Sequence, residues 1–187
     1  MGITAFDALP DAEARALLLS CAAVPGWADR LVAGRPYGST TALLDAAAAG
    51  AATWSAADVD AALADHPRIG ERPTGTGASA AMSRREQAGV SEADADALAR
   101  LRAGNAAYEE RFGRIYLVRA KGRTTEELLA LLDQRLTHDP ATEAEVVRGQ
   151  LAEIALLRLA DLIPHPDSPD LSSPDPDSHD PEKQDPA

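Results

Sequence analysis

The chain has 187 residues, and its 18 Lys and Arg against 30 Asp and Glu give a formal net charge of −12 at pH 7. A nucleic-acid-binding protein needs clustered cations for phosphate groups, so this charge argues against that class. Hydrophobic residues make up 45% of the chain but aromatic residues only 4%, with many alanines. Because alanine favours helices and strands favour β-branched and aromatic residues, the composition predicts an all-α fold.

Most of the chain is predicted to form a compact single-domain bundle of about seven to eight helices. Apolar residues recur at helical spacing, Gly or Pro ends most segments, and Ser55, Thr124 or Thr125, and Asp139-Pro140 are expected helix starts. A loop rich in Pro and Gly is expected over 67–78, and residues 115–118 are expected to be a short extended connector. The expected helices cover 11–23, 26–33, 40–49, 56–65, 79–87, 92–112, 125–137 and 140–163.

The composition changes at Pro164. Segment 164–187 holds seven of the 13 prolines and has seven acidic residues against one lysine, and Leu171 is its only large apolar residue. Such a segment cannot bury enough apolar surface to offset the entropy of ordering it. The sequence therefore predicts a helical domain over 1–163 and a disordered acidic tail over 164–187.

Cys21 is the only cysteine, so neither an intramolecular disulfide nor a multi-cysteine zinc site can form within the chain. We interpret it as a small buried hydrophobic residue. No secretory signal is visible, and no apolar run approaches the length of a membrane span. We expect a cytoplasmic protein that binds neither membranes nor nucleic acid.

His66 and His138 are the only histidines outside the predicted tail. His66 stands at the expected end of a helix and precedes Pro67. Its imidazole could cap the helix C-terminus, which is the more common situation for an arbitrary His-Pro pair. It could also be presented rigidly at a loop junction for acid–base chemistry near neutral pH. The dense Pro, Gly and charged residues that follow favour this second interpretation somewhat.

A second cluster combines a hydroxyl, a carboxylate and an amide. Ser83, Glu86 and Gln87 are three and four residues apart, so they project from one face of a helix and could hold a small polar ligand. Ser-x-x-Glu is equally the pattern of a capping box. The spacing leaves both interpretations open.

Arg158 falls on the apolar stripe of the last expected helix. Burying its guanidinium is costly unless the charge is paired. The side chain could reach to the edge of the stripe, pair with an internal acid or grip oxygen atoms of a ligand.

Two further sets of residues, each taken as a group, carry no predicted catalytic or metal-binding role. Asn105, Tyr108 and Phe112 share a helix face, and core packing with one polar contact explains them. His66, Glu71 and Glu86 could be combined into a metal site, but their spacing is irregular and we expect no metal.

Together these motifs resemble those of the 2-oxo-4-hydroxy-4-carboxy-5-ureidoimidazoline (OHCU) decarboxylases of uric acid breakdown. The resemblance covers roughly residues 3–163, with Tyr37 and Tyr116 in place of expected Phe and His138 in place of expected Asn. The matching pieces are His66-Pro67-Arg68-Ile69-Gly70, Ser83-x-x-Glu86-Gln87, Asn105-x-x-Tyr108-x-x-x-Phe112-Gly113, Tyr116 to Gly122, Arg135-Leu136 and Glu153-Ile154-x-x-x-Arg158-Leu159.

The resemblance implies an all-α homodimer that converts OHCU to (S)-allantoin and CO2 without cofactor or metal. It places the catalytic pair on His66 and Glu86. We hypothesise that His66 is the acid–base group, that Glu86 orients it and tunes its pKa, and that Arg158 anchors substrate oxygen atoms. The remaining implied substrate contacts are Pro67, Ser83 and Gln87, with main-chain hydrogen bonds from the connector at Leu117 and Arg119.

Other functions stay open at this point. One is a non-catalytic all-α interaction module whose tail recruits partners. Another is a metal-dependent hydrolase, for which the chain has few histidines. A third is a decarboxylase of a related ureido-acid.

Overall fold

The computed structural model describes residues 1–64, 66–71, 78–86 and 95–165. In these segments the chain forms nine α-helices and no strand, which confirms the predicted all-α fold. The helices are α1 (Ile3–Asp7), α2 (Asp11–Cys21), α3 (Pro25–Ala33), α4 (Thr40–Ala51), α5 (Ala56–Leu63), α6 (Ala78–Glu86), α8 (Ala95–Phe112), α9 (Thr125–Arg135) and α10 (Pro140–Leu162).

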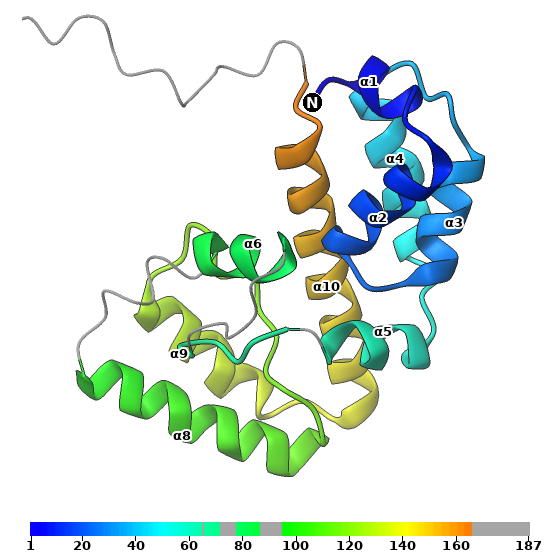
Figure 1. Ribbon diagram of the computed structural model, residues 1–187. Coiled ribbons are helices and arrows are strands. Elements are labelled where there is room, and N and C mark those ends of the chain that lie inside the picture. The colour runs from blue at the N-terminus through cyan, green and yellow to red at the C-terminus, as the bar shows by residue number, and fades with distance from the viewer. Residues whose placement is uncertain (65, 72–77, 87–94, 166–187) are drawn as a thin grey trace, which may run out of the picture.

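The long helix α10 runs through the middle of the molecule (Figure 1). It packs against α2, α4 and α5, while α8 and α9 pack against each other on its other side. Its buried positions recur three or four residues apart and lie along one stripe, which faces these neighbours. They include Val147, Leu151, Ile154, Ala155 and Leu159.

The apolar interior is divided into two clusters. The larger one joins α1 to α5 with α10 and contains Trp27 and Trp54, whose rings meet edge to face. The smaller one joins α8, α9 and the connector around Tyr108 and Tyr116. The candidate site described below lies where these two clusters meet.

The predicted helix starts are observed. Ser55 forms a capping box with Asp58, and Thr124 forms one with Glu127. The carboxylate of Asp139 accepts hydrogen bonds from the first main-chain N–H groups of α10, with Pro140 in the first turn. These side chains satisfy N–H groups that have no partner within the helix.

The main difference from the expectation is α1, which the sequence does not signal by any cap or repeat. It forms because tertiary contacts hold it: Phe6 is fully buried, and Arg35 donates hydrogen bonds to the carbonyls of Phe6 and Leu9. The predicted disorder of the tail concerns residues that, beyond 165, lie outside the described part of the chain. Among the helices that the structure describes, none combines the length and the apolarity that crossing a bilayer requires.

We expect Cys21 to be chemically inert in the folded protein. Its side chain is fully buried, and burial is the main cause that raises the pKa of its thiol to about 12. Because the thiolate is the reactive form, a disulfide reagent such as DTNB should not label the native chain at pH 8 but should label it in guanidinium chloride. Rapid labelling of the native protein would contradict this burial.

Candidate active site

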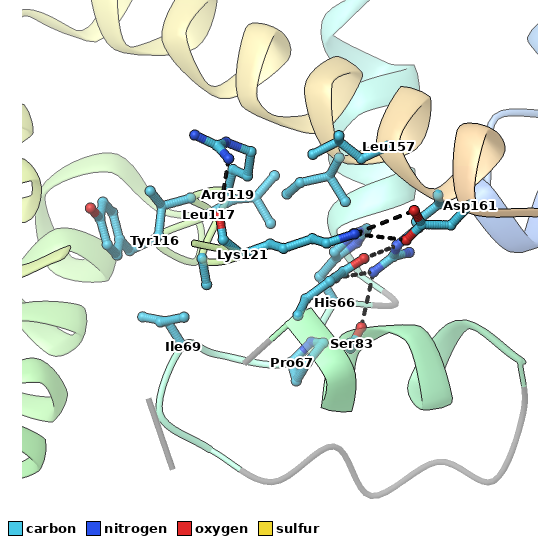
Figure 2. A pocket seen from close by; sticks show the side chains of 15 residues that line it. His66, Pro67, Ile69, Ser83, Tyr116, Leu117, Arg119, Lys121, Leu157 and Asp161 are labelled. Atoms are coloured by element: carbon cyan, nitrogen blue, oxygen red, sulfur yellow. Dashed lines mark hydrogen bonds and ion pairs between the residues drawn. The ribbon is translucent and has the colours of Figure 1, made fainter. Parts of the chain in front are cut away.

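A pocket opens between the end of α5, helix α6, the connector and α10 (Figure 2). In Figure 2, His66 and Pro67 lie on one side of it, and Leu157 and Asp161 of α10 on the other. All the predicted site residues that fall in the described part of the chain line this pocket, and Gln87 is not among the described residues. They are His66, Pro67, Ser83, Glu86, Leu117, Arg119 and Arg158.

The ring of His66 is held by the helix that precedes it. Its Nδ1 lies 2.9 Å from the carbonyl oxygen of Ala62, in the last turn of α5. A carbonyl oxygen can only accept, so Nδ1 carries the hydrogen and Nε2 carries the lone pair of the neutral ring. The capping interpretation is therefore confirmed, and it leaves an acid–base role of Nε2 chemically possible.

The loop after His66 is fastened to α8. Asn105 donates a hydrogen bond from Nδ2 to the carbonyl of Ile69 at 3.0 Å, which is the one polar contact expected for this residue. Arg68 binds both carboxylate oxygens of Glu109, at 2.5 and 2.9 Å. Gly70 has a φ of +80°, which L residues with side chains rarely adopt. These features fix the path of the chain through Pro67.

Arg158 is buried, with 2% of its surface exposed, and pairs with an internal acid. Its Nε and Nη2 donate to the two carboxylate oxygens of Glu86 at 2.6 and 2.8 Å. Nη2 also donates to Ser83 Oγ at 3.0 Å. Such a two-pronged pair compensates the buried charge in a way that a single ammonium cannot.

The position of Ser83 within α6 decides between its two interpretations. The helix begins at Ala78, so Ser83 and Glu86 stand inside it rather than at its start, and the capping-box interpretation is wrong. Both residues instead point toward Arg158, so the predicted shared helix face is correct for this pair.

Glu86 has a different main contact from the one we expected. Both of its oxygens bind Arg158, while the His66 ring donates its Nδ1–H to the carbonyl of Ala62. The sequence could not reveal this pairing because Glu86 and Arg158 are 72 residues apart.

The connector is extended over residues 115–120, two residues longer than expected, and its side chains alternate between the two apolar clusters. Tyr116, Val118 and Ala120 pack in the smaller cluster and Leu117 in the larger one. In an extended chain, the main-chain N–H and C=O groups of successive residues point to opposite edges. Residues 117 and 119 therefore share one edge, and residue 118 faces the other.

The edge at 117 and 119 is already occupied by side chains of this protein. The Leu117 carbonyl accepts a hydrogen bond from Arg135 Nη1 at 2.6 Å, and the Arg119 N–H donates one to Gln150 Oε1 at 2.9 Å. The Arg119 carbonyl accepts another from Arg123 at 2.8 Å. Within the described part of the chain, no group of the protein occupies the main-chain N–H or C=O of Val118, which lines the pocket.

One pair of charges in the pocket was not predicted. Lys121 Nζ lies 2.9 Å from a carboxylate oxygen of Asp161, and both side chains are largely exposed. In the residues described here, no three His, Cys, Asp or Glu side chains gather as metal ligands, so His66, Glu71 and Glu86 do not form the set considered from the sequence.

Comparisons with known proteins agree with the family suggested by the motifs. A family model described as OHCU decarboxylase matches residues 7–160. An OHCU decarboxylase from Haloferax volcanii is 30% identical over 138 residues, which cover 73% of this chain and 80% of that protein. One from Amia calva is 39% identical over 103 residues, which cover 54% of this chain and 59% of that protein. The matched stretch thus spans less than two thirds of the Amia calva protein.

The fold is also found among solved structures. A crystal structure of an OHCU decarboxylase in the presence of (S)-allantoin superposes with a TM-score of 0.63 and 24% sequence identity, covering 77% of this chain and 94% of that one. A structure of (S)-allantoin synthase superposes with a TM-score of 0.65 and 20% identity, covering 87% of this chain and 54% of that one. At these identities the two structures support the fold alone.

Proposed function

Because the chain belongs to the OHCU decarboxylase family, we propose that it converts OHCU into (S)-allantoin and CO2. The observation that carries this proposal is that one pocket is lined by His66, by Ser83 and Glu86 of α6, and by Arg158 of α10. These are the residues that the family resemblance selects, and they come from three separate parts of the chain.

The reaction needs an electron sink, and the substrate supplies it. When the C–C bond to the carboxylate breaks, its electron pair forms a C=C bond within the ring, and the π pair of the adjacent C=N moves to the ring nitrogen, which takes up a proton. The hydroxyl loses its proton and becomes a carbonyl, and a proton is delivered to the neighbouring ring carbon. The protein then has to orient the carboxylate out of the ring plane, stabilise the developing charge and deliver the proton to one face.

His66 is suited to the proton transfers. With Nδ1–H donated to Ala62, Nε2 can take the hydroxyl proton and return a proton to carbon. Delivery from one face accounts for a single enantiomer. Glu86, fixed by Arg158, places a carboxylate in the same pocket, and Ser83 adds a hydroxyl beside it.

Main-chain recognition of the substrate is proposed at Val118, on the edge of the connector opposite to Leu117 and Arg119. The carbonyl of Leu117 is held by Arg135, and the N–H of Arg119 is held by Gln150. The N–H and C=O of Val118 are then the groups that can bind the ring or the ureido arm, since amide groups complement such donors and acceptors. Leu117 and Arg119 would contribute by lining the pocket.

We expect Arg158→Lys to raise KM about tenfold, because a lysine cannot hold both oxygens of Glu86 and reach Ser83 at the same time. Steady-state kinetics on freshly generated OHCU measures this. Arg114→Lys is the matched control, since Arg114 pairs with Asp60 outside the pocket and should keep the normal KM. An unchanged KM in Arg158→Lys would remove Arg158 from substrate anchoring.

A coupled assay tests the reaction. Urate is oxidised and the first hydrolysis is completed, the protein is added, and circular dichroism follows the appearance of optically active allantoin. We expect a faster rise than the spontaneous reaction gives. No acceleration with OHCU rejects the proposal, and acceleration only with a related ureido-acid would assign the chain to that substrate.

Three further features are proposed from the sequence. The chain forms a homodimer, acts in the cytoplasm and carries its activity in residues 1–163 without the tail over 164–187. Light scattering after size-exclusion chromatography tests the first of these. A chain ending at residue 165 should retain full kcat/KM if the third is correct.

A further inference from the structure

We propose that Arg135 and Gln150 are positioning residues, which hold the connector so that its opposite edge forms a wall of the pocket. The proposal concerns how the site is built and, for its effect on turnover, rests on the proposed decarboxylase function. Neither side chain lines the pocket. Each acts on it through one main-chain group, the carbonyl of Leu117 for Arg135 and the N–H of Arg119 for Gln150.

The connector depends on such side chains because no neighbouring strand supports it. In a sheet, the N–H and C=O groups of an extended segment are held by the adjacent strand. In the described part of this protein no residue is in a strand, so the path of the connector is fixed by side chains that reach its main chain. A buried main-chain N–H or C=O group without a partner costs free energy. A shift of the connector along its path would leave such groups unpaired, so these contacts favour the observed position.

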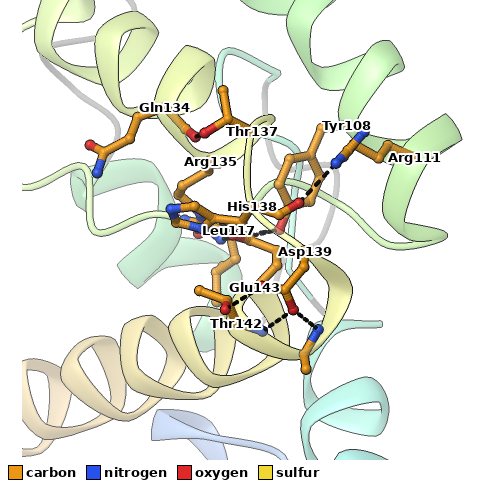
Figure 3. Close-up of polar contacts among 11 residues, drawn as sticks. Tyr108, Arg111, Leu117, Gln134, Arg135, Thr137, His138, Asp139, Thr142 and Glu143 are labelled. Carbon is orange, nitrogen blue, oxygen red and sulfur yellow. Dashed lines mark hydrogen bonds and ion pairs between the residues drawn. The ribbon is translucent and has the colours of Figure 1, made fainter.

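Arg135 is itself held rigidly in a buried cluster (Figure 3). Its Nε lies 2.8 Å from Oε1 of Glu143 on α10, and Nη2 donates to the same oxygen and to the hydroxyl of Tyr108 on α8. The guanidinium also lies over the ring of Tyr116, 4.8 Å from its centre. With its other edge committed to these groups, Nη1 is directed at the Leu117 carbonyl at 2.6 Å.

This geometry requires a guanidinium rather than any cation. A planar group with five N–H donors in fixed directions can serve a carboxylate, a hydroxyl and a carbonyl together. Lysine at this position keeps the charge beside Glu143 but has to release some of these partners. The neutral partners, the Leu117 carbonyl and the Tyr108 hydroxyl, are the ones that an ammonium gives up more readily than the carboxylate of Glu143.

Gln150 reaches the connector from a different helix and by an independent contact. It belongs to α10 and accepts a hydrogen bond from the Arg119 N–H at 2.9 Å. Its side chain is only partly buried. Removing it should therefore release the connector with little loss of core packing.

The experiment compares Arg135→Lys and Gln150→Ala with two controls. Arg35→Lys alters another arginine, whose side chain is 8% exposed and donates to main-chain carbonyls, those of Phe6 and Leu9, away from the pocket. Gln134→Ala removes an exposed glutamine of α9. For each variant, kcat and KM are measured with OHCU, and hydrogen–deuterium exchange is measured on peptides that cover residues 115–120.

We expect both test variants to raise KM about three- to tenfold, which corresponds to the loss of one hydrogen bond, with a smaller change in kcat. We expect amide exchange at 115–120 to accelerate in both, and in neither control. Wild-type KM and exchange in Gln150→Ala overturn the proposal for Gln150, and an Arg135→Lys that behaves like Arg35→Lys overturns it for Arg135. If Arg135→Lys does not fold, the result for Gln150→Ala decides whether side chains behind the connector position it.

The two proposals can fail separately. A wild-type chain that does not accelerate allantoin formation rejects the proposed function. The exchange measurement still tests the positioning role in that case, because it needs no substrate.

Discussion

We expect His66→Ala to lower kcat about a thousandfold while the far-UV circular dichroism of the protein stays unchanged. A positioned acid–base group contributes about 10²- to 10⁴-fold to a proton-transfer step. His66 presents Nε2 as the lone-pair nitrogen because Nδ1 donates to Ala62. Alanine removes the only imidazole among the residues that line the described pocket, and no other side chain there replaces its ability to take and return a proton near neutral pH.

His66→Asn separates this chemistry from the capping role. An asparagine amide can still donate to the carbonyl of Ala62, so the end of α5 should be preserved, but it cannot exchange a proton near neutral pH. We therefore expect His66→Asn to lose nearly as much kcat as His66→Ala. Turnover near the wild-type level in the asparagine variant would assign His66 to structure alone.

The largest expected effect on stability is at Glu143. We expect Glu143→Ala to lower the free energy of unfolding by about 3–5 kcal/mol, measured by urea denaturation. Glu143 is 1% exposed and binds Arg135, the Tyr108 hydroxyl and Nδ1 of His138. Its removal leaves a buried guanidinium without a counter-charge. Burial and this carboxylate also raise the pKa of Tyr108, so its hydroxyl stays protonated and donates.

Glu145 on the same helix provides the matched control. Its side chain is 64% exposed and pairs with Arg148 one turn further on. Because exposed pairs contribute little, Glu145→Ala should lower the unfolding free energy by no more than about 1 kcal/mol. Equal effects of the two substitutions would show that the buried cluster does not stabilise the fold.

Local signals made much of the fold predictable. Ser55, Thr124 and Asp139-Pro140 mark helix starts because the groups they satisfy lie within three residues. The apolar stripe around Arg158 required a partner for that charge, and Glu86 is that partner. His66, Ser83 and Arg158 line one pocket, as the resemblance implies, because the fold of a family brings its motif residues together.

The features that could not be predicted depend on contacts between distant parts of the chain. Helix α1 is too short to show a period and is held by Arg35. The two edges of the connector differ because Arg135, Gln150 and Arg123 approach one of them. His138, which stands where the family pattern suggests Asn, places Nδ1 2.8 Å from a carboxylate oxygen of Glu143, a contact that depends on how the chain enters α10 although the two residues are only five apart.

The spacing of residues along helix α10 fixes the relative positions of the groups that build the site. Glu143 holds Arg135, which lies behind the connector, and Gln150 holds the connector itself. Further along the same helix, Arg158 holds the carboxylate of Glu86 on α6. A helix turns about 100° per residue and rises about 1.5 Å, so inserting one residue between Gln150 and Arg158 would swing the guanidinium about a quarter-turn away from Glu86. Surface loops could change in length without breaking the contact between Arg158 and Glu86. Within α10, in contrast, the number of residues between Gln150 and Arg158 has to stay constant for the pocket to form.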